Sequence, residues 1–437
     1  MIRILREKEE ITNFLRSLEA RAPSEDPEVA LRVREIIAQV RERGENGVLE
    51  LRERFEGCPR TFPLTFRRAA LMERAKECPA GTLKIIQQAV ERVRAFHEIQ
   101  KESDRWTTLG SSRFASRVQP LDSVAIYVPG GKAFYPSSVV MAAVPAMVAG
   151  VQRISIFTPA RSVDDPVFAA TVCALGIEEV HAVGGAQAVA MATYGVAGVP
   201  RFDKIVGPGN VYVATAKQIL AGRIGIDSFA GPSEILILSD GSSPAEWIAL
   251  DMLAQAEHDE DASAVLVTTC AREADEVAER LRSLLPEVCR ERAAIAEASV
   301  SRWGAICLVE DKASQIEVAN ALHAEHLHVQ TSCALTEAGE QFWLSHLKGV
   351  GAIFLGKWSA ESFGDYLAGP SHVLPTAGTA RFSSPLGVYD FLRRSSVLCL
   401  SKADSISLSE GTGDFADAER LWAHAASARI RAKGQGE

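Results

Sequence analysis

Side chains that can bind a metal ion are concentrated in the second half of this 437-residue chain. Gln255 and His258 stand three residues apart, Asp365 and His372 share a segment rich in Gly and Pro, and His424 comes later. Nitrogen and oxygen ligands of these types suit a divalent metal such as Zn²⁺, which usually takes about four of them. Together these residues predict a four-ligand metal site, although none of them predicts it alone.

A Glu-His pair, Glu325 and His326, lies between these positions, with His323 and His328 on either side. An imidazole, with an unperturbed pKa of ~6.5, suits a general base near neutral pH. Adjacent side chains point in different directions, so the pair would not bind one ion but could accept two protons in turn. A surface location is the alternative. A metal site beside a proton-transfer pair indicates an enzyme.

A predicted helix carries Gln255 and His258 on one face. Ser243 could be its N-cap, with Pro244 at the first helical position and Glu246 completing a capping box. Two side chains on one face can converge on one ion. The alternative is a glutamine that is hydrogen-bonded and a histidine that is partly buried, with no metal.

The other candidate ligands lie in a loop and near the end of the chain. Asp365 and His372 follow a predicted strand, and a polar loop with few apolar anchors is ordered most readily by a ligand. An ordinary surface loop is the alternative. Glu419 and His424 fall on one predicted final helix, separated by about 140° around its axis. They could flank a pocket, or belong to a solvated helix face.

The composition is that of a soluble globular protein, with 47% hydrophobic and 24% charged residues. Lys and Arg number 47 against 56 Asp and Glu, a net charge of -9 without a dense basic block, which argues against a nucleic-acid partner. No apolar run approaches the ~20 residues that span a bilayer. The first residues mix charges and lack a signal-peptide pattern, so we expect a cytoplasmic location.

The cysteine pattern excludes two kinds of small-protein framework. The eight cysteines contain no CxxC pair, which argues against a thiolate zinc site and against a disulfide scaffold. We expect most of them to be small buried side chains.

The hydrophobic pattern predicts an α/β fold with two successive Rossmann-like parallel sheets. Short β-branched runs that end in Gly or Pro alternate with Ala-rich helical stretches, as in parallel sheets covered on both faces. The predicted regions are a helical N-terminal region (1–110), a first α/β domain (111–230), a second α/β domain with the metal and catalytic residues (231–380), and a small C-terminal segment (381–437). That last segment is too small to fold alone and must pack on the body or on a partner subunit.

Glycine-rich loops follow three predicted strands of the first α/β domain, at Gly130-Gly131, Gly184-Gly185 and Gly207–Asn210. Such loops, with helix N-termini just beyond, suit the phosphates of a dinucleotide. Tight turns without a ligand are the alternative. The nearest match to GxGxxG, residues 411–416, follows polar residues and is predicted to be a loop at a helix start.

The chain resembles the histidinol dehydrogenase family over nearly its full length. The matching stretches are YVPGGKAFYPSSVVM, VGGAQAVAMATYG, DKIVGPGNVYV, FAGPSEILIL, LAQAEHD, AEHLHVQT, GAIFLG, FGDYLAGPSHVLPTAGTARFSSPL and ERLWAHAASARIR. The resemblance implies a homodimeric enzyme of histidine biosynthesis with one Zn²⁺ per subunit. It would oxidise L-histidinol through L-histidinal to L-histidine with two NAD⁺ and one water.

The resemblance also implies a role for each candidate residue. The zinc ligands would be Gln255, His258, Asp365 and His424. Glu325 and His326 would be catalytic, the histidine as base for the hydroxyl proton and the glutamate activating water. Ser233, His372 and Glu419 would bind substrate together with Glu325 and the four ligands, and Tyr127, Gln187 and Asn210 would contact NAD. The C-terminal segment would reach into the partner subunit, so that Glu419 and His424 complete the partner's site.

The sequence departs from the family pattern at several positions near these residues, among them Arg420 after Glu419 and five that bear on the choice of substrate. These five are Ala142, Met147, Ala324, His328 and Arg393. They leave room for a paralogue that oxidises another polar primary alcohol, such as a sulfonated or amino alcohol. A zinc hydrolase, with Glu325 activating a metal-bound water, and a non-catalytic paralogue are the alternatives from other classes.

Overall fold

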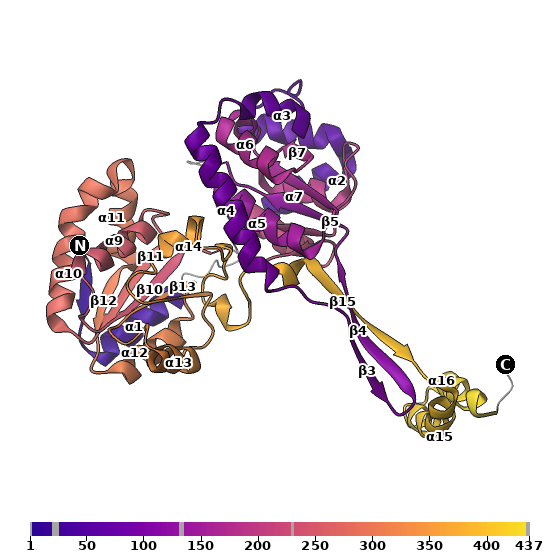
Figure 1. Ribbon diagram of the computed structural model, residues 1–437. Coiled ribbons are helices and arrows are strands. Elements are labelled where there is room, and N and C mark those ends of the chain that lie inside the picture. The colour runs from indigo at the N-terminus through magenta and orange to yellow at the C-terminus, as the bar shows by residue number, and fades with distance from the viewer. Residues whose placement is uncertain (1, 20–25, 131–134, 229–230, 434–437) are drawn as a thin grey trace. The chain divides into compact units, whose positions relative to one another are not determined.

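The computed structural model describes residues 2–19, 26–130, 135–228 and 231–433, which form two compact units (Figure 1). The first unit comprises the chain up to Gln100 together with Asp122–Phe391, and it contains two six-stranded sheets. The second unit comprises Lys101–Leu121 and the chain from Leu392 onward. The two sheets of the first unit confirm the predicted pair of Rossmann-like α/β folds.

The first sheet has the strand order β2-β7-β6-β5-β8-β9. Its strands are β5 (Ser123–Tyr127), β6 (Arg153–Thr158), β7 (Glu179–Ala182), β8 (Lys204–Val206), β9 (Gly225–Ile226) and β2 (Thr65–Arg67). β2 runs antiparallel to β7, and the other pairings are parallel. The chain builds the sheet outward from β5 to β7 and then crosses to β8. The loops after β5 and β8 therefore flank a switch point, where ligands bind in open α/β sheets.

Helices cover both faces of this sheet. α2 (Pro27–Glu56), α7 (Gly185–Tyr194) and α8 (Val211–Leu220) pack together over the face to which Ala125 and Tyr127 of β5 point. α3 (Arg68–Ala75), α4 (Ala80–Glu98), α5 (Pro136–Ala149) and α6 (Pro166–Leu175) pack against one another on the opposite face, and η1 (Ala160–Asp164) lies before α6. The two faces follow from right-handed crossovers on opposite sides of β5.

Helix α2 is bent into two arms at Gly44, whose φ of 54° lies in the left-handed region. The arms approach so closely that a Cβ at Gly47 would lie 2.5 Å from the carbonyl oxygen of Gln39. Glycine is needed at both positions, first for the backbone conformation and then for the contact.

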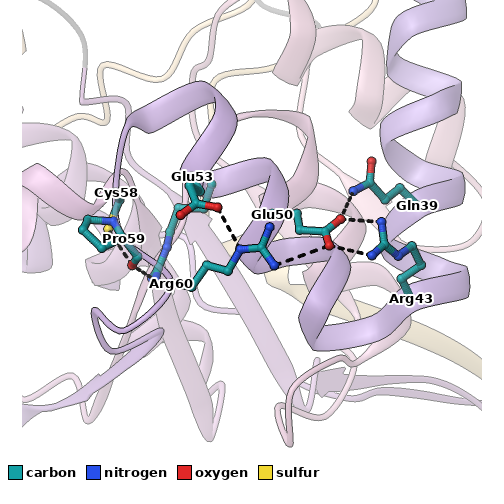
Figure 2. A network of polar contacts seen from close by, with 8 residues as sticks. Gln39, Arg43, Glu50, Glu53, Cys58, Pro59 and Arg60 are labelled. Atoms are coloured by element: carbon teal, nitrogen blue, oxygen red, sulfur yellow. Dashed lines mark hydrogen bonds and ion pairs between the residues drawn. The ribbon is translucent and has the colours of Figure 1, made fainter.

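A network of charged side chains joins the two arms of α2 (Figure 2). Glu50 accepts a hydrogen bond from Gln39 at 3.0 Å and also binds the guanidinium of Arg43. Arg60 extends the network, 3.5 Å from Glu50 and 2.8 Å from Glu53. Exposed pairs contribute little singly, but a network holds each side chain more firmly. The second arm of α2 is thereby fixed, and its last residue reaches the strand-end loops of the first sheet.

The second sheet is parallel throughout, in the order β1-β12-β11-β10-β13-β14. Its strands are β1 (Arg3–Leu5), β10 (Glu234–Ser239), β11 (Ser263–Thr268), β12 (Ala305–Leu308), β13 (His326–Gln330) and β14 (Ala352–Leu355). α9 (Ala245–Ala256), α10 (Ala271–Val288) and α11 (Ala293–Trp303) cover one face, and α1 (Lys8–Glu19), α12 (Lys312–Leu322) and α13 (Glu337–His346) cover the other. The remaining elements of this unit are α14 (Glu361–Tyr366), η2 (Arg290–Arg292), η3 (Thr379–Arg381) and η4 (Val388–Phe391).

The sequence had predicted that residues 1–110 are helical, but this region also contains strands. Strand β1 pairs with β12 at the edge of the second sheet, and α1 packs against α12. Strand β2 lies at the edge of the first sheet. Each of these two strands has only three residues, with charged residues beside them. Neither therefore shows the alternation of apolar and polar residues from which a strand is predicted.

The second unit is an antiparallel sheet followed by a helical hairpin. β3 (Arg105–Leu109), β4 (Ser112–Pro120) and β15 (Leu392–Cys399) form the sheet in the order β15-β4-β3. α15 (Lys402–Ala418), α16 (Trp422–Arg429) and η5 (Ile430–Lys433) follow. The C-terminal chain therefore folds with residues 101–121, which the sequence had assigned to other regions.

The single final helix predicted from the sequence is two helices. α15 ends at Ala418 with Glu419 as its C-cap, and Arg420, with a φ of 60°, reverses the chain into α16. Residues 411–416 lie inside α15, so the predicted helix-start loop is wrong. A Cβ at Gly413 would lie 2.6 Å from Nε of Arg429, and glycine there lets the two helices approach. Among the described residues, no helix is long and apolar enough to cross a membrane.

Candidate active site

The residues predicted to carry the chemistry gather at the amino ends of strands β10 and β13. Ser233 precedes β10, Glu325 precedes β13, and His326 is the first residue of β13. The loop after α9, which contains His258, leads into the amino end of neighbouring β11. Ligands in open α/β sheets usually bind at the carboxyl ends of strands. This candidate site therefore lies at the opposite edge of the second sheet.

His326 is buried and its ring is oriented by the backbone. Its Nδ1 lies 3.1 Å from the carbonyl oxygen of Glu234, 3.5 Å from Oε1 of Glu361 and 3.7 Å from Oε2 of Glu325. Burial lowers the pKa of His326 to about 3, so the imidazole is neutral at pH 7. With the proton on Nδ1 donated to the Glu234 carbonyl, Nε2 is the nitrogen that can accept a proton.

Glu325 is as buried as its neighbour, at 5% exposure. Its Oε2 accepts a hydrogen bond of 2.9 Å from the backbone N–H of Glu234. One residue of β10 thus binds both members of the pair, its N–H to Glu325 and its carbonyl to His326. The surface alternative for the Glu-His pair is wrong, because both side chains are enclosed.

A cavity of 530 Å³ opens beside His326 and is also lined by Asp365 and His372. His372 places Nδ1 3.0 Å from the carbonyl oxygen of Asp365 and Nε2 3.4 Å from Oγ of Ser138. Burial lowers the pKa of His372 to about 4 and raises that of Asp365 to about 6. Aromatic side chains form much of the remaining wall, among them Phe354, Trp358 and Phe363. The cavity combines a neutral base with polar groups on an apolar wall, as ligand pockets do.

The amide group of Gln255 is fully buried, and neither its Oε1 nor its Nε2 has a hydrogen-bond partner among the described residues. A buried polar group left without partners costs about 1–3 kcal/mol. A metal ion bound to Oε1 would offset part of that cost, so Gln255 fits the predicted metal site.

The other predicted ligands are divided between the two units. His258 lies close enough to His326 and His372 to affect their pKa values electrostatically. His424 belongs to the second unit. No group of three His, Cys, Asp or Glu side chains suited to a metal ion occurs in the part of the chain that the structure describes. Such a group is not expected here, because one predicted ligand is a glutamine and another lies in a different unit.

The helix that carries Gln255 differs in detail from the prediction. Pro244 is its N-cap, because the hydroxyl of Ser243 donates instead to the carbonyl of Gln330 at 3.3 Å. α9 ends at Ala256, so His258 lies beyond the helix rather than on one face with Gln255. The guanidinium of Arg292 fixes this turn, with 2.6 Å to the carbonyl oxygen of Glu257 and 2.9 Å to that of His258.

Glu361 is a site residue that the sequence reasoning missed. It is 3% exposed, and its Oε2 has no hydrogen-bond partner among the described residues. Burial and the nearby carboxylates of Asp365, Glu325 and Asp251 raise its pKa well above the usual range. It stands one helical turn before Asp365 on α14. That spacing, visible in the sequence, could have indicated it.

The residues predicted to contact NAD line a second cavity, of 910 Å³, at the first sheet. Tyr127 ends β5, and burial raises its pKa to about 12. Gln187 lies in the first turn of α7 at 2% exposure. Asn210 caps α8, where its Oδ1 accepts from the N–H of Val213 at 3.2 Å. The cavity is thus formed where strand-end loops meet helix N-termini, as predicted.

Several backbone N–H groups of the glycine loops are already bonded within the protein. Gly184 donates to Glu56 at 2.8 Å and Gly185 to the hydroxyl of Tyr127 at 3.1 Å. Gly207 donates to Asp227 at 2.6 Å. These three N–H groups are therefore engaged within the protein, and dinucleotide binding at the glycine loops stays a prediction. Gly131 of the first loop lies outside the described residues.

Glu419 and His424 lie in the second unit, on different elements of the hairpin. Glu419 follows the last residue of α15, and His424 lies in the first turn of α16. Both are exposed. The same hairpin exposes Phe415 at 71% and Trp422 at 70%. Large apolar side chains at that exposure are typical of a surface that another chain covers.

Comparison with known proteins gives concordant matches. The family model for histidinol dehydrogenase matches residues 19–432. Histidinol dehydrogenase of Pseudomonas syringae pv. syringae (strain B728a) is 46% identical over 412 residues, covering 93% of this chain and 90% of that protein. The protein of the same name from Methylococcus capsulatus is 44% identical, covering 93% of each chain. The crystal structure of histidinol dehydrogenase from Elizabethkingia anophelis matches with a TM-score of 0.90 and 26% identity, covering 99% of this chain and 98% of that one.

Proposed function

Because the chain belongs to the histidinol dehydrogenase family, we propose that it oxidises L-histidinol through L-histidinal to L-histidine. Two NAD⁺ accept the two hydrides, and one water supplies the second carboxylate oxygen. The observation that carries the proposal is the neutral, buried His326, oriented by Glu234 and facing a cavity that also contains Asp365 and His372. Such a base can take a proton from an alcohol as hydride departs.

The two members of the Glu-His pair have successive roles in this proposal. His326 accepts the hydroxyl proton at Nε2 in the first oxidation. Glu325 then activates the water that attacks the aldehyde carbon in the second oxidation. Their shared partner Glu234 holds the two side chains next to each other at the amino end of β13. Retaining the aldehyde between the steps avoids releasing a reactive product.

The proposed metal is one Zn²⁺ per subunit, held by Gln255, His258, Asp365 and His424. The unpartnered amide of buried Gln255 supports this assignment. When bound, the ion would hold the amino and imidazole nitrogens of the substrate and so fix its orientation. The proposal assigns the remaining substrate contacts to Ser233, His372 and Glu419.

NAD-dependent oxidation of an alcohol and an aldehyde is the activity of the family. We assign the NAD contacts to Tyr127, Gln187 and Asn210. All three line the 910 Å³ cavity, which is large enough for a ligand of this size. Its place at the strand ends of the first sheet agrees with the usual position of nucleotides in such folds.

The proposed assembly is a homodimer in the cytoplasm, in which each subunit completes the partner's site with Glu419 and His424. Its support is the exposed apolar surface of the hairpin, which includes Phe415 and Trp422. A partner subunit that buries these side chains would remove their contact with water.

A related enzyme for another polar primary alcohol, such as a sulfonated or amino alcohol, is the second candidate. The five departures from the family pattern that bear on the choice of substrate do not favour it, because none of them lines the 530 Å³ cavity. They are Ala142, Met147, Ala324, His328 and Arg393. His328 is fully buried and bonds through its ring nitrogens to Gln330 and to the carbonyl of Gly356. A zinc hydrolase would leave the NAD-sized cavity without a use.

The decisive experiment is NADH formation from L-histidinol before and after removal of metal by a chelator. We expect two NADH per histidinol, loss of turnover on chelation and recovery with Zn²⁺. No turnover by the zinc-loaded protein would contradict the proposal. A panel of other polar primary alcohols would then test the second candidate.

A further inference from the structure

Glu56 ends α2 and lies on the wall of the 910 Å³ cavity. Its Oε1 accepts from the backbone N–H of Gly184 at 2.8 Å and from the side-chain amide of Gln187 at 3.4 Å. Its Oε2 accepts from the backbone N–H of Ala160 at 3.0 Å. One carboxylate therefore connects α2 to the loop after β6, to the loop after β7 and to the first turn of α7.

Arg52, one helical turn earlier on α2, binds a backbone carbonyl group at the start of the loop after β7. It is fully buried and donates to the carbonyl oxygen of Ala182 at 3.2 Å. The hydroxyl of Tyr127 accepts from Gly185 on the other side of the loop. The loop from Ala182 to Gly185 is thus fixed through both its carbonyl and its amide groups.

The carboxylate of Glu56 stands where a phosphate would bind in a glycine-rich dinucleotide loop. The amino end of a helix attracts anions because its first N–H groups lack partners within the helix. At α7 these groups are engaged at Gly184 and Gly185. Gln187 also folds back over the helix end, since a Cβ at Gly185 would lie 2.7 Å from its Oε1. A second anion at this point would find few free donors and would meet the charge of Glu56.

We propose that Glu56 is a positioning residue of the cofactor pocket, which occupies the anion position at the amino end of α7 and holds Gln187 in place. The phosphates of NAD⁺ then bind elsewhere in the cavity, where Arg32, Arg54 and Arg161 supply positive charge. This inference rests on the proposed function, because it takes the 910 Å³ cavity as the NAD site.

The test measures binding of NAD⁺ and of inorganic pyrophosphate to the full-length protein by titration calorimetry. In Glu56→Ala we expect NAD⁺ to bind at least about tenfold more weakly, because hydrogen bonds to a charged group hold the pocket. We expect pyrophosphate to bind at least about fivefold more tightly, because the helix end is vacated. A merely structural role would weaken NAD⁺ binding without any gain for pyrophosphate, so the second measurement distinguishes the two.

Two further variants sharpen the test. Glu45→Ala is the matched control, because Glu45 lies on the same helix, is exposed and does not line the cavity. It should leave both affinities unchanged. Glu56→Gln keeps the size of the side chain and removes its charge, so it should gain pyrophosphate affinity even if the alanine variant does not fold.

Unchanged NAD⁺ affinity in Glu56→Ala, or no gain of pyrophosphate affinity in either variant at this position, would overturn the inference. Because binding is measured without turnover, its outcome is separate from that of the proposed function. A protein that binds NAD⁺ but does not oxidise L-histidinol would refute the function and leave this test intact. If the wild-type protein bound no NAD⁺, the assignment of the pocket, and with it the inference, would fail.

Discussion

Oε1 of Glu361 lies 3.5 Å from Nδ1 of His326, and both side chains are almost completely buried. The contact joins α14 to the first residue of β13, so a carboxyl group stands behind the proposed base, on the side away from Nε2. A carboxyl group in this position can orient an imidazole and stabilise the imidazolium that forms when the base accepts a proton.

We expect Glu361→Gln to lower kcat for L-histidinol about tenfold to 100-fold, which is less than the 10²–10⁴-fold loss expected for His326→Asn. The amide keeps the shape of the side chain but, unlike the carboxyl group with its raised pKa, cannot become charged when the imidazolium forms, so it cannot stabilise that ion. Steady-state kinetics would separate this fall in kcat from any change in KM for L-histidinol or NAD⁺. A kcat equal to that of the wild type would show that Glu361 does not assist the base.

The turn that carries His258 offers a second prediction. Arg292 binds the carbonyl oxygens of Glu257 and His258 with one planar guanidinium. Arg292→Ala should reduce zinc affinity about tenfold to 100-fold, as expected when a support behind a metal ligand is lost. Arg292→Lys should recover little, because an ammonium group does not reproduce the two-pronged geometry. Competition with a chromophoric chelator measures the affinity directly.

Arg280 provides the control for this prediction, since it is exposed on α10. Arg280→Ala changes the net charge by the same amount and should leave zinc affinity unaltered. Equal zinc affinity in Arg292→Ala and Arg280→Ala would show that the guanidinium does not position His258.

The sequence predicted the repeated α/β architecture well because buried parallel strands are short, uninterrupted apolar runs. Strand β10, for example, is buried at all six positions, and its residues read as one such run. β1 escaped prediction because its three residues belong to the second sheet only through pairing with β12, about 300 residues later. The chain reversal at Arg420 was not predicted either, because a residue other than glycine that adopts a positive φ cannot be recognised from its type.

The candidate site was predicted through family resemblance more than through its own chemistry. Residue types and spacing indicated Gln255, His258 and the Glu-His pair, but they did not show that these groups meet at the amino edge of the sheet. Glu56 was missed because its role arises from contacts between distant segments, whereas Glu361 was missed although its spacing of one helical turn from Asp365 is visible in the sequence. Glu56 reaches a loop 128 residues away. A single carboxylate in a charged helix carries no local signal of that kind.

Acid should destabilise the protein partly through His181, which is fully buried on β7. Burial, with smaller effects from Arg153 and Arg67, lowers its pKa from 6.5 to about 4, although Glu179 lies 3.9 Å away. Above pH 6.5 the histidine is neutral in both states and contributes no pH dependence. Between pH 6.5 and about 4 the unfolded chain binds a proton that the folded chain does not, so stability falls as pH falls.

The loss from this residue is on the order of 3 kcal/mol across that range. Urea unfolding of the metal-free protein at several pH values would measure it. His181→Gln should lower stability at neutral pH but flatten its decline toward pH 4, whereas His346→Gln, at an exposed histidine, should leave the slope unchanged. An undiminished slope in His181→Gln would refute the assignment.

Subunit complementation tests whether the C-terminal hairpin completes the partner's site. His326 and His424 belong to different compact units of one chain. If His424 serves the partner subunit, a heterodimer of His326→Asn and His424→Asn chains has one site with both substitutions and one site with neither. Unfolding and refolding an equal mixture of the two inactive variants should then restore about one quarter of wild-type activity, since about half of the dimers formed are mixed and each has one intact site.

A mixture of His326→Asn and His258→Asn, which are both in the first unit, should stay inactive, because every site formed contains one of the two substitutions. Failure of the first mixture to recover, with dimers present, would mean that each chain supplies its own His424.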